Sequence, residues 1–440
     1  MASTYLSKTF SAGNQKTWTW SFWTKIPNYD ASNNKAIFSG YNDANNLLKI
    51  QFTNTDQFQS YGLSSGSLVC RLVTNQLFRD YNAWYHIVYS LDTTQATSTD
   101  RQKLWVNGEE ITSFSTRTDP SQNADLQINN TIGHQIGATN NADHYSNCMA
   151  HCHFIDGTRY DASYFGQTDA TSGIWKPKIS PSVTYGTNGF FLKFGNAGSL
   201  GTDSSGNGNN FTVNGSGTQT LDTPSNVFAT LNPLINFQNS SSYSNGNNTV
   251  TGGGTGSGDS PSSTLAVSSG KYYCEVKIIS TDAGGEGVGI IDIDKWNPYA
   301  NADEWFFRYS YGYGYANANG NKFNNNSGSA YGDSYTNGDI VGIALDLDNN
   351  YLYFSKNGVW QNSGDPTSGA SGTGSAFNIA SGNYVFSFYH YYSHVLSTNF
   401  GNPPFTISSG NSDGNGFGNF EYAPPTNYFS LCSSNLAEYG

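Results

Sequence analysis

The densest group of metal-ligating side chains in the sequence comprises His144, Cys148, His151, Cys152 and His153. On a β-strand, side chains alternate between faces, so the two cysteines would point one way and His151 and His153 the other. A zinc site would need a second ligand pair at zinc-finger spacing, which the sequence does not offer. We therefore expect the cysteines to pack as small core residues and the two histidines to form an exposed pair.

Two Asp- and Asn-rich turns offer oxygen ligands that would suit calcium. One contains Asp203, Asn207 and Asn209, and the other contains Asp346, Asp348 and Asn350. Neither turn has the glutamate-closed spacing of an EF-hand loop. The same residues also form turns by hydrogen-bonding their own backbone. Calcium is thus a candidate ligand, and no cofactor is required.

The sequence does not reveal the carboxylate pair that a glycosidase needs across the scissile bond. Acidic residues stand singly or in turns, and Glu109 and Glu110 are adjacent on a predicted strand, so they face opposite sides. Residues 284–289 are glycine-rich but lack the lysine and helix of a phosphate loop. We expect no enzymatic activity and assign no catalytic residue. A polysaccharide depolymerase would need two carboxylates that meet across a cleft, and the sequence neither places nor excludes such a pair.

Aromatic residues with regular spacing are the strongest candidates for ligand recognition. Tyrosine rings offer a rigid apolar face and a polar tip, which suits contact with proteins or stacking on sugar rings. Tyrosine at alternate positions is equally typical of a strand that packs in a core or a subunit contact. The candidate ligand-binding residues are Trp305, Tyr309, Tyr311, Tyr313, Tyr389 and Tyr391.

These residues must be positioned by short strands, which the apolar pattern predicts throughout the chain. Trp18, Trp20 and Phe22 alternate with Thr and Ser, which indicates a half-buried strand. The dipeptides at 107–108 and 357–358 are Asn-Gly, which favours hairpin turns. Both follow a strand, an Asp-containing turn and a second strand, a likeness that reflects either common descent or a shared way of building hairpins. One short helix is expected at 161–166, with Asp161 as its N-cap.

Composition supports a folded, β-rich protein and excludes several partners. The 440 residues are 12% charged and 15% aromatic, with 49 glycines. The formal charge of −12 without a basic patch argues against nucleic acid and anionic lipid surfaces. No stretch reaches the roughly 20 apolar residues of a membrane helix, and the N-terminus has no apolar segment typical of a signal peptide. Five scattered cysteines indicate reduced thiols and synthesis in a cytoplasm.

Distinct sets of motifs occur in the two halves of the chain. In the first half they are residues 5–7, 18–23, 83–88, 104–108, 153–157, 165–166 and 203–210. This half resembles the laminin-G-like, concanavalin A-like jelly roll found in many bacteriophage structural proteins. In the second half they are residues 273–276, 338–342, 345–346, 354, 357–358, 399–401 and 404–405. This half resembles a SPRY domain, although SPRY domains usually carry tryptophan where this chain has Cys274.

The resemblance implies an all-β chain with two β-sandwich domains in tandem. The expected domains are a jelly roll at 1–220, a linker and loop at 221–263, a SPRY-like sandwich at 264–410 and a C-terminal segment at 411–440. The join near 222–233 and the ending at 422–432 look like those of phage tail and virion proteins with this pairing.

Bacteriophage context in turn implies a role on the virion. We expect a tail fibre or adhesin that binds a host surface glycan or protein without catalysis. The alternative is an architectural subunit, a capsid decoration or fibre protein that binds other virion proteins. Either protein would be made in the host cytoplasm, act on the virion, form a homo-oligomer and not insert into a membrane.

Overall fold

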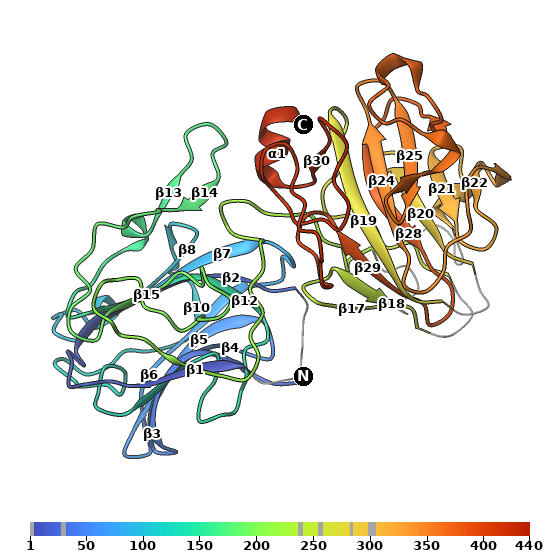
Figure 1. Ribbon diagram of the computed structural model, residues 1–440. Coiled ribbons are helices and arrows are strands. Elements are labelled where there is room, and N and C mark those ends of the chain that lie inside the picture. The colour runs from blue at the N-terminus through green and yellow to red at the C-terminus, as the bar shows by residue number, and fades with distance from the viewer. Residues whose placement is uncertain (1–3, 28–31, 236–240, 254–257, 282–284, 298–304) are drawn as a thin grey trace. The chain divides into compact units, whose positions relative to one another are not determined.

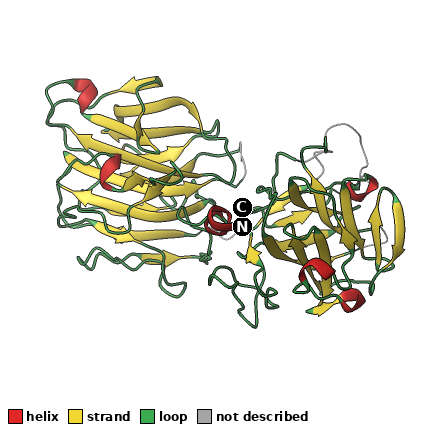
Figure 2. Ribbon diagram, turned by 90° about the horizontal axis from the view of Figure 1, so that it is seen from above, coloured by secondary structure: helices red, strands yellow, loops and turns green. Residues whose placement is uncertain are grey.

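The computed structural model describes residues 4–27, 32–235, 241–253, 258–281, 285–297 and 305–440. They divide into two compact units, residues 1–219 and 220–440 (Figure 1). β-Strands are the main regular structure of both units, and within the described ranges helical structure is confined to short turns and one C-terminal helix, α1 (Ser433–Tyr439) (Figure 2). The short turns are 3₁₀ helices at Ser98–Asp100, Ala162–Tyr164, Phe306–Arg308, Gln361–Ser363 and Gly369–Ser371. The predicted fold class, two β-sandwich domains in tandem, is confirmed.

Unit 1 (residues 1–219) is built from two antiparallel sheets and a separate hairpin. The eight-stranded sheet has the order β10 (Phe114–Thr118), β6 (Ser67–Leu77), β5 (Gln57–Ser64), β4 (Asn46–Phe52), β3 (Lys35–Asp43), β11 (Gly133–Ile136), β1 (Tyr5–Thr9), β16 (Thr212–Asn214). The six-stranded sheet has the order β15 (Phe190–Leu192), β12 (Cys148–Asp156), β2 (Thr17–Lys25), β7 (Trp84–Asp92), β8 (Gln102–Val106), β9 (Glu109–Glu110). The hairpin pairs β13 (Gly166–Thr168) with β14 (Trp175–Pro177).

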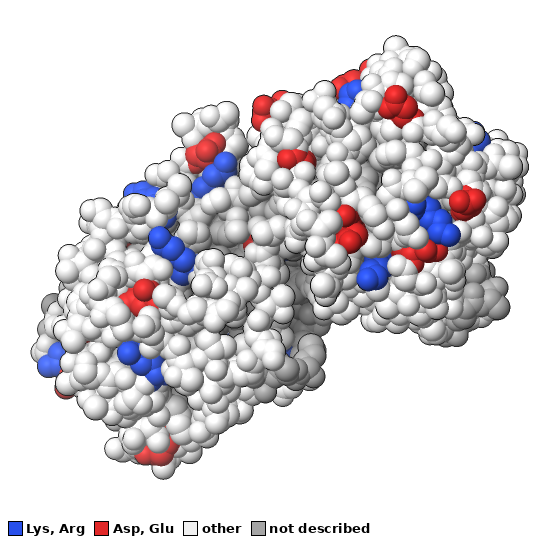
Figure 3. All heavy atoms as spheres, in the orientation of Figure 1, with Lys and Arg blue, Asp and Glu red and all other residues white. Residues whose placement is uncertain are grey.

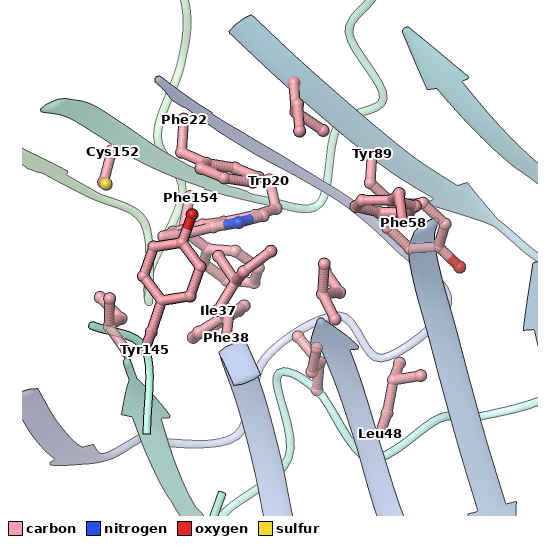
Figure 4. Close-up of a cluster of buried hydrophobic side chains, with 14 of the residues drawn as sticks. Trp20, Phe22, Ile37, Phe38, Leu48, Phe58, Tyr89, Tyr145, Cys152 and Phe154 are labelled. Carbon is pink, nitrogen blue, oxygen red and sulfur yellow. The ribbon is translucent and has the colours of Figure 1, made fainter. Parts of the chain in front are cut away.

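The core of unit 1 lies between these two sheets, and β2 supplies its largest side chains. Trp18, Trp20 and Phe22 are fully buried there, as their alternation predicts. Trp20 stacks on Phe38 of β3 with ring centroids 4.5 Å apart (Figure 4). The predicted inward face of this strand is therefore confirmed.

The opposite face of the six-stranded sheet is also covered. Ala162 and Phe165, which precede β13, form a small apolar cluster with Val88 of β7 and Ile155 of β12. Ser21, on the outward face of β2, is fully buried as a result. The sequence predicted a half-buried strand because the pattern of β2 alone cannot show that a later segment packs over its polar face.

The predicted alternation along residues 148–155 is wrong because β12 contains a β-bulge. The pairing with β2 shifts between Ala150 and His153, and His151 takes a positive φ of 46°. The additional residue places Cys152 in the core but leaves Cys148 on the other face. His153 is buried rather than exposed, because its ring lies against Phe165 and Phe191.

Unit 2 (residues 220–440) is a second sandwich. Its larger sheet has the order β17 (Ser242–Ser244), β18 (Thr249–Thr251), β29 (Val395–Asn399), β19 (Lys271–Ser280), β24 (Ile340–Asp346), β25 (Tyr351–Lys356), β26 (Val359–Trp360), with β27 (Phe377–Asn378) on β25 and β30 (Phe429–Ser430) on β19. Its smaller sheet has the order β23 (Ser327–Ala330), β22 (Asn321–Asn324), β21 (Gly312–Ala316), β20 (Gly287–Asp292), β28 (Tyr384–Tyr389).

Both flanking segments of the expected SPRY-like domain pack into unit 2. The segment expected as linker and loop, 221–263, contributes β17 and β18 to the larger sheet. The C-terminal segment, 411–440, contributes β30 and places Phe420 and Tyr428 against Tyr273 on the outer face of β19. The serine, asparagine and glycine content of the segment 221–263 is typical of a loop, but backbone groups of β17 and β18 still pair in the sheet.

The two Asn-Gly hairpin turns have the same geometry. Asn107 and Asn357 have the same φ of 48°, and each is followed by a glycine with positive φ. The Asn107 side-chain oxygen accepts from the His86 amide at 2.8 Å, and the Asn357 oxygen accepts from the Ile340 amide at 2.9 Å. Each asparagine therefore ties its turn to the start of the strand that precedes the hairpin, β7 for Asn107 and β24 for Asn357.

In the part of the chain that the structure describes, no helix has the length and hydropathy needed to cross a membrane.

Candidate functional site

The predicted tyrosine run is divided between two faces of the smaller sheet of unit 2. Tyr313 and Tyr315 of β21 point into the core between the sheets, and Tyr313 is only 7% exposed. Tyr309 and Tyr311 precede β21 and lie in a separate cluster on the outer face of the sheet. The alternation of tyrosines therefore follows a strand only from Gly312 onward, where β21 begins.

Glycines make room for aromatic rings on this outer face. Gly287 of β20 and Gly314 of β21 both lie directly beneath Phe307, and a β-carbon at either position would overlap its ring. The 3₁₀ helix Phe306–Arg308 can therefore lie flat on the sheet. The spacing of glycines between aromatic residues is the sequence signal for this arrangement, and the sequence reasoning did not use it.

The resulting aromatic layer is defined by Trp305, Phe306, Phe307, Tyr309, Tyr311, Phe323, Tyr389 and Tyr391. Trp305 contacts several of its members, with ring centroids 5.2 Å from Phe307, 6.1 Å from Tyr389 and 6.1 Å from Phe323. Tyr309 and Tyr311 stack almost in parallel, 4.9 Å apart with an interplanar angle of 7°. The layer thus combines stacked and edge-to-face ring pairs on one face of the sheet.

Five of the six predicted ligand-binding residues lie in this layer. Trp305, Tyr309, Tyr311 and Tyr391 are partly exposed, whereas Tyr389 is 9% exposed and supports Trp305 from beneath. Tyr313 lies on the other face and is separated from the layer by the sheet. Phe306, Phe307 and Phe323 are layer members that the sequence reasoning missed.

Charge is distributed unequally between the units. Residues 1–219 contain 14 Lys and Arg against 15 Asp and Glu, whereas residues 220–440 contain 6 against 17. On the visible face of the molecule, charged side chains lie singly or in small groups among uncharged ones (Figure 3). The unit that carries the aromatic layer thus holds most of the net negative charge of the chain.

The oxygen ligands of the first predicted calcium turn already accept hydrogen bonds. One Asp203 oxygen accepts from the amides of Phe191 and Ser205 at 2.8 Å, and the other accepts from the Ser205 hydroxyl and the Asn209 amide at 2.8 Å. The side-chain amides of Asn207 and Asn209 donate to the Gly189 carbonyl at 2.9 Å. These contacts form a turn that holds residues 186–189.

The second predicted calcium turn is organised in the same way. The Asp346 carboxylate pairs with Lys271 at 2.9 Å and accepts from the Asn349 amide at 2.9 Å. Asp348 accepts from the Gly270 amide at 3.0 Å. A calcium ion in either turn would have to displace these donors.

Calcium is therefore expected to leave the melting temperature of the full-length protein unchanged within about 1 °C, because an ion that gains no open ligands adds little native-state stability. The measurement compares thermal unfolding in millimolar calcium with unfolding after EDTA treatment. A rise of several degrees on adding calcium would contradict the expectation and assign a calcium site.

The described residues include no group of three or more His, Cys, Asp or Glu side chains arranged to hold a metal ion. Serine, histidine and aspartate do meet in unit 2, where the Ser241 hydroxyl lies 2.5 Å from Asp259 and 3.0 Å from His390 Nε2. All three are buried, and the serine bonds to both partners, so the histidine does not link nucleophile to acid. These three residues therefore pack together without the hydrogen-bond order of a catalytic triad.

The geometry thus defines a class of protein with two β-sandwiches in tandem and an aromatic surface. Comparisons with known proteins assign each sandwich. Residues 2–154 match the concanavalin A-like lectin/glucanases superfamily, and residues 271–402 match the SPRY domain. The chain therefore carries a laminin-G-like, concanavalin A-like domain followed by a SPRY domain.

Solved structures similar to part of the chain include two SPRY domains. The SPRY domain of human HERC1 shares 19% identity, covers 38% of this chain and 96% of its own, and has a TM-score of 0.31. A human SPRY domain shares 16% identity, covers 36% and 94%, and has a TM-score of 0.28. A search of curated proteins gave no match. Domains of both kinds are typically non-catalytic binding modules.

Proposed function

We propose that this protein is a non-enzymatic adhesin of a bacteriophage virion, which binds a host surface glycan or protein through the aromatic layer of its SPRY domain. The observation that carries the proposal is the layer itself. Trp305, Tyr309, Tyr311 and Tyr391 remain partly exposed although they lie on a firmly packed aromatic base. Rigid aromatic side chains of this kind lose little conformational entropy when they bind a ligand.

The charge of unit 2 supports a neutral ligand. With 6 basic against 17 acidic residues, residues 220–440 repel polyanions such as phosphorylated or strongly acidic polysaccharides. The stacked Tyr309–Tyr311 pair offers a flat apolar face for a sugar ring, and its hydroxyl groups can exchange hydrogen bonds with the sugar. We therefore expect neutral host polysaccharides to bind more strongly than acidic ones.

The double variant Tyr309→Ala/Tyr311→Ala is expected to weaken binding roughly thirtyfold, because truncating an aromatic hot spot costs about 2 kcal/mol. The measurement is the dissociation constant of the full-length protein for host cells and for purified neutral and acidic surface polysaccharides. Tyr313 is left intact because it is a core residue whose loss would weaken the fold.

A matched control is Tyr164→Ala in unit 1, which removes a tyrosine that is 40% exposed and distant in sequence from the layer. The control should bind like the wild-type protein, and all variants should keep their melting temperatures. Unchanged binding by the folded double variant would overturn the assignment of the layer. Binding to other virion proteins, with none to host surfaces, would instead support the architectural role.

A further inference from the structure

Unit 1 contains a covering segment, residues 158–185, that lies on the outer face of the six-stranded sheet. Its start is tied to β2, where the Thr19 hydroxyl donates to the Thr158 carbonyl at 3.0 Å and accepts from the Tyr160 amide at 2.9 Å. Its middle contains the β13–β14 hairpin, which Figure 1 shows at the margin of the unit. We call this segment the strap.

The hairpin is held to the sheet through Trp175 and His86. The indole Nε1 donates to His86 Nδ1 at 2.9 Å, and His86 Nε2 lies 2.9 Å from the Ser21 hydroxyl. An indole N–H can only donate, so His86 Nδ1 must be unprotonated, and the ring proton sits on Nε2. The bond therefore exists only while His86 is neutral.

The end of the strap meets a second buried histidine. The Tyr185 hydroxyl lies 2.9 Å from His153 Nδ1, and both rings stack with an interplanar angle of 16°. Burial raises the pKa of Tyr185, so its hydroxyl stays neutral. The strap is thus fastened to the sheet at two imidazoles.

The groups that act electrostatically on these histidines are basic. His151 acts on both, and His86 and Lys193 act on His153. Lys25 shares the outward face of β2 with Ser21. Lys103 of β8 and Glu110 of β9 pair with each other at 2.7 Å, and Lys176 of the hairpin pairs with Asp169 at 3.4 Å. Among the described residues, these contacts provide no carboxylate partner for a charged His86.

We propose that the strap is an acid-released cover: when His86 takes up a proton, Trp175 loses its acceptor and residues 158–185 lift from the six-stranded sheet. Release uncovers Val88 and Ile155, whose apolar side chains the strap now buries with Ala162 and Phe165. The switch is independent of the aromatic layer, because it lies wholly within unit 1.

The pH range of release follows from the two states of His86. Burial, and to a smaller extent His151, lower the pKa of His86 from 6.5 to about 3 in the closed state. In the open state the ring is hydrated and titrates near 6.5. The closed state therefore keeps its full stability above pH 6.5 and loses it as the pH falls toward 3, with the opening constant rising about tenfold per pH unit for each proton taken up.

The test is hydrogen–deuterium exchange of the full-length protein at pH 7, 6 and 5, corrected for the intrinsic exchange rate. We expect the opening constant of strap amides to rise about tenfold between pH 6 and pH 5. Amides in β2 and β7, which exchange only on larger unfolding, should remain protected. Strap opening that does not change between pH 7 and pH 5 would overturn the proposal.

The variant Trp175→Phe tests the specific bond from the strap side. It should raise strap opening relative to wild type by a similar factor at pH 7 and at pH 5, because the closed-state pKa of about 3 keeps His86 neutral and its bond to Trp175 intact at both pH values. His134→Asn is the matched control, since this buried histidine bonds to Asn129 and Ile132 and lies against Phe10 and Phe38 of the core, away from the strap. Strap opening in Trp175→Phe that is no greater than in wild type would show that this bond does not hold the strap and would overturn the proposal.

Discussion

The variant Glu275→Ala is expected to lose about 3–5 kcal/mol of unfolding free energy in unit 2, the largest single effect that we predict. Glu275 lies on β19 and is fully buried. Its carboxylate accepts from the Tyr422 amide at 2.7 Å, the Glu421 amide at 3.0 Å and Asn399 at 3.2 Å. Alanine would leave these donors buried without an acceptor.

The measurement is urea unfolding, with the shift in midpoint read at an unchanged slope. Glu275→Gln is the matched control, since it keeps one acceptor oxygen and the side-chain volume, and it should lose about half as much. The carboxylate fastens the C-terminal segment to the larger sheet, so the alanine variant should also expose residues 411–440 to protease. An alanine variant as stable as the glutamine variant would contradict this role.

Mild acid is expected to destabilise unit 1 by several kcal/mol between pH 7 and pH 5. Burial lowers the pKa of His86 and of His134 to about 3, and that of His151 to about 4. In the unfolded chain these histidines titrate near 6.5 and become charged. Their contribution is complete above pH 6.5 and is lost as the pH falls, at about 1.4 kcal/mol per pH unit for each fully titrating histidine.

Unfolding in urea at pH 7, 6 and 5, followed by hydrogen exchange of unit 1 peptides, measures this loss. The variant His134→Gln should be less stable at pH 7 but should lose less stability per pH unit than wild type. Glu275 has the opposite sign, because burial raises its pKa, but it lies in unit 2. Equal urea midpoints at pH 7 and pH 5 would show that the histidines are not neutral in the folded state.

The sequence was sufficient to predict features that depend on neighbours along the chain. The alternation in β2 placed Trp18, Trp20 and Phe22 in the core, because a strand has a fixed period of two. The Asn-Gly turns were predictable because only a few residues tolerate positive φ at no great cost. The short helix at 161–166 is a 3₁₀ turn in which Asp161 caps Ser163, as its N-cap residue predicts.

Features that depend on contacts between distant segments could not be predicted. The bulge in β12 puts Cys148 on the face opposite to Cys152, although both were assigned to the core face, and no residue type in that strand predicts the bulge. The outer faces of two sheets are covered by segments with weak patterns of their own, the strap and residues 411–440. For the candidate site, the residue types were predictable. The tyrosine alternation was treated as one surface, although it continues into β21, where Tyr313 points into the core.

The glycines beneath Phe307 have a consequence for how such a surface can diversify. Any side chain at Gly287 or Gly314 would collide with the ring above it, so the base of the layer tolerates almost no change. Tyr309, Tyr311 and Tyr391 rest on that base from the solvent side, where substitution alters the surface without disturbing the sheet. Exchange of the outer aromatic residues would therefore change the surface that the layer presents, while the platform beneath it stays constant.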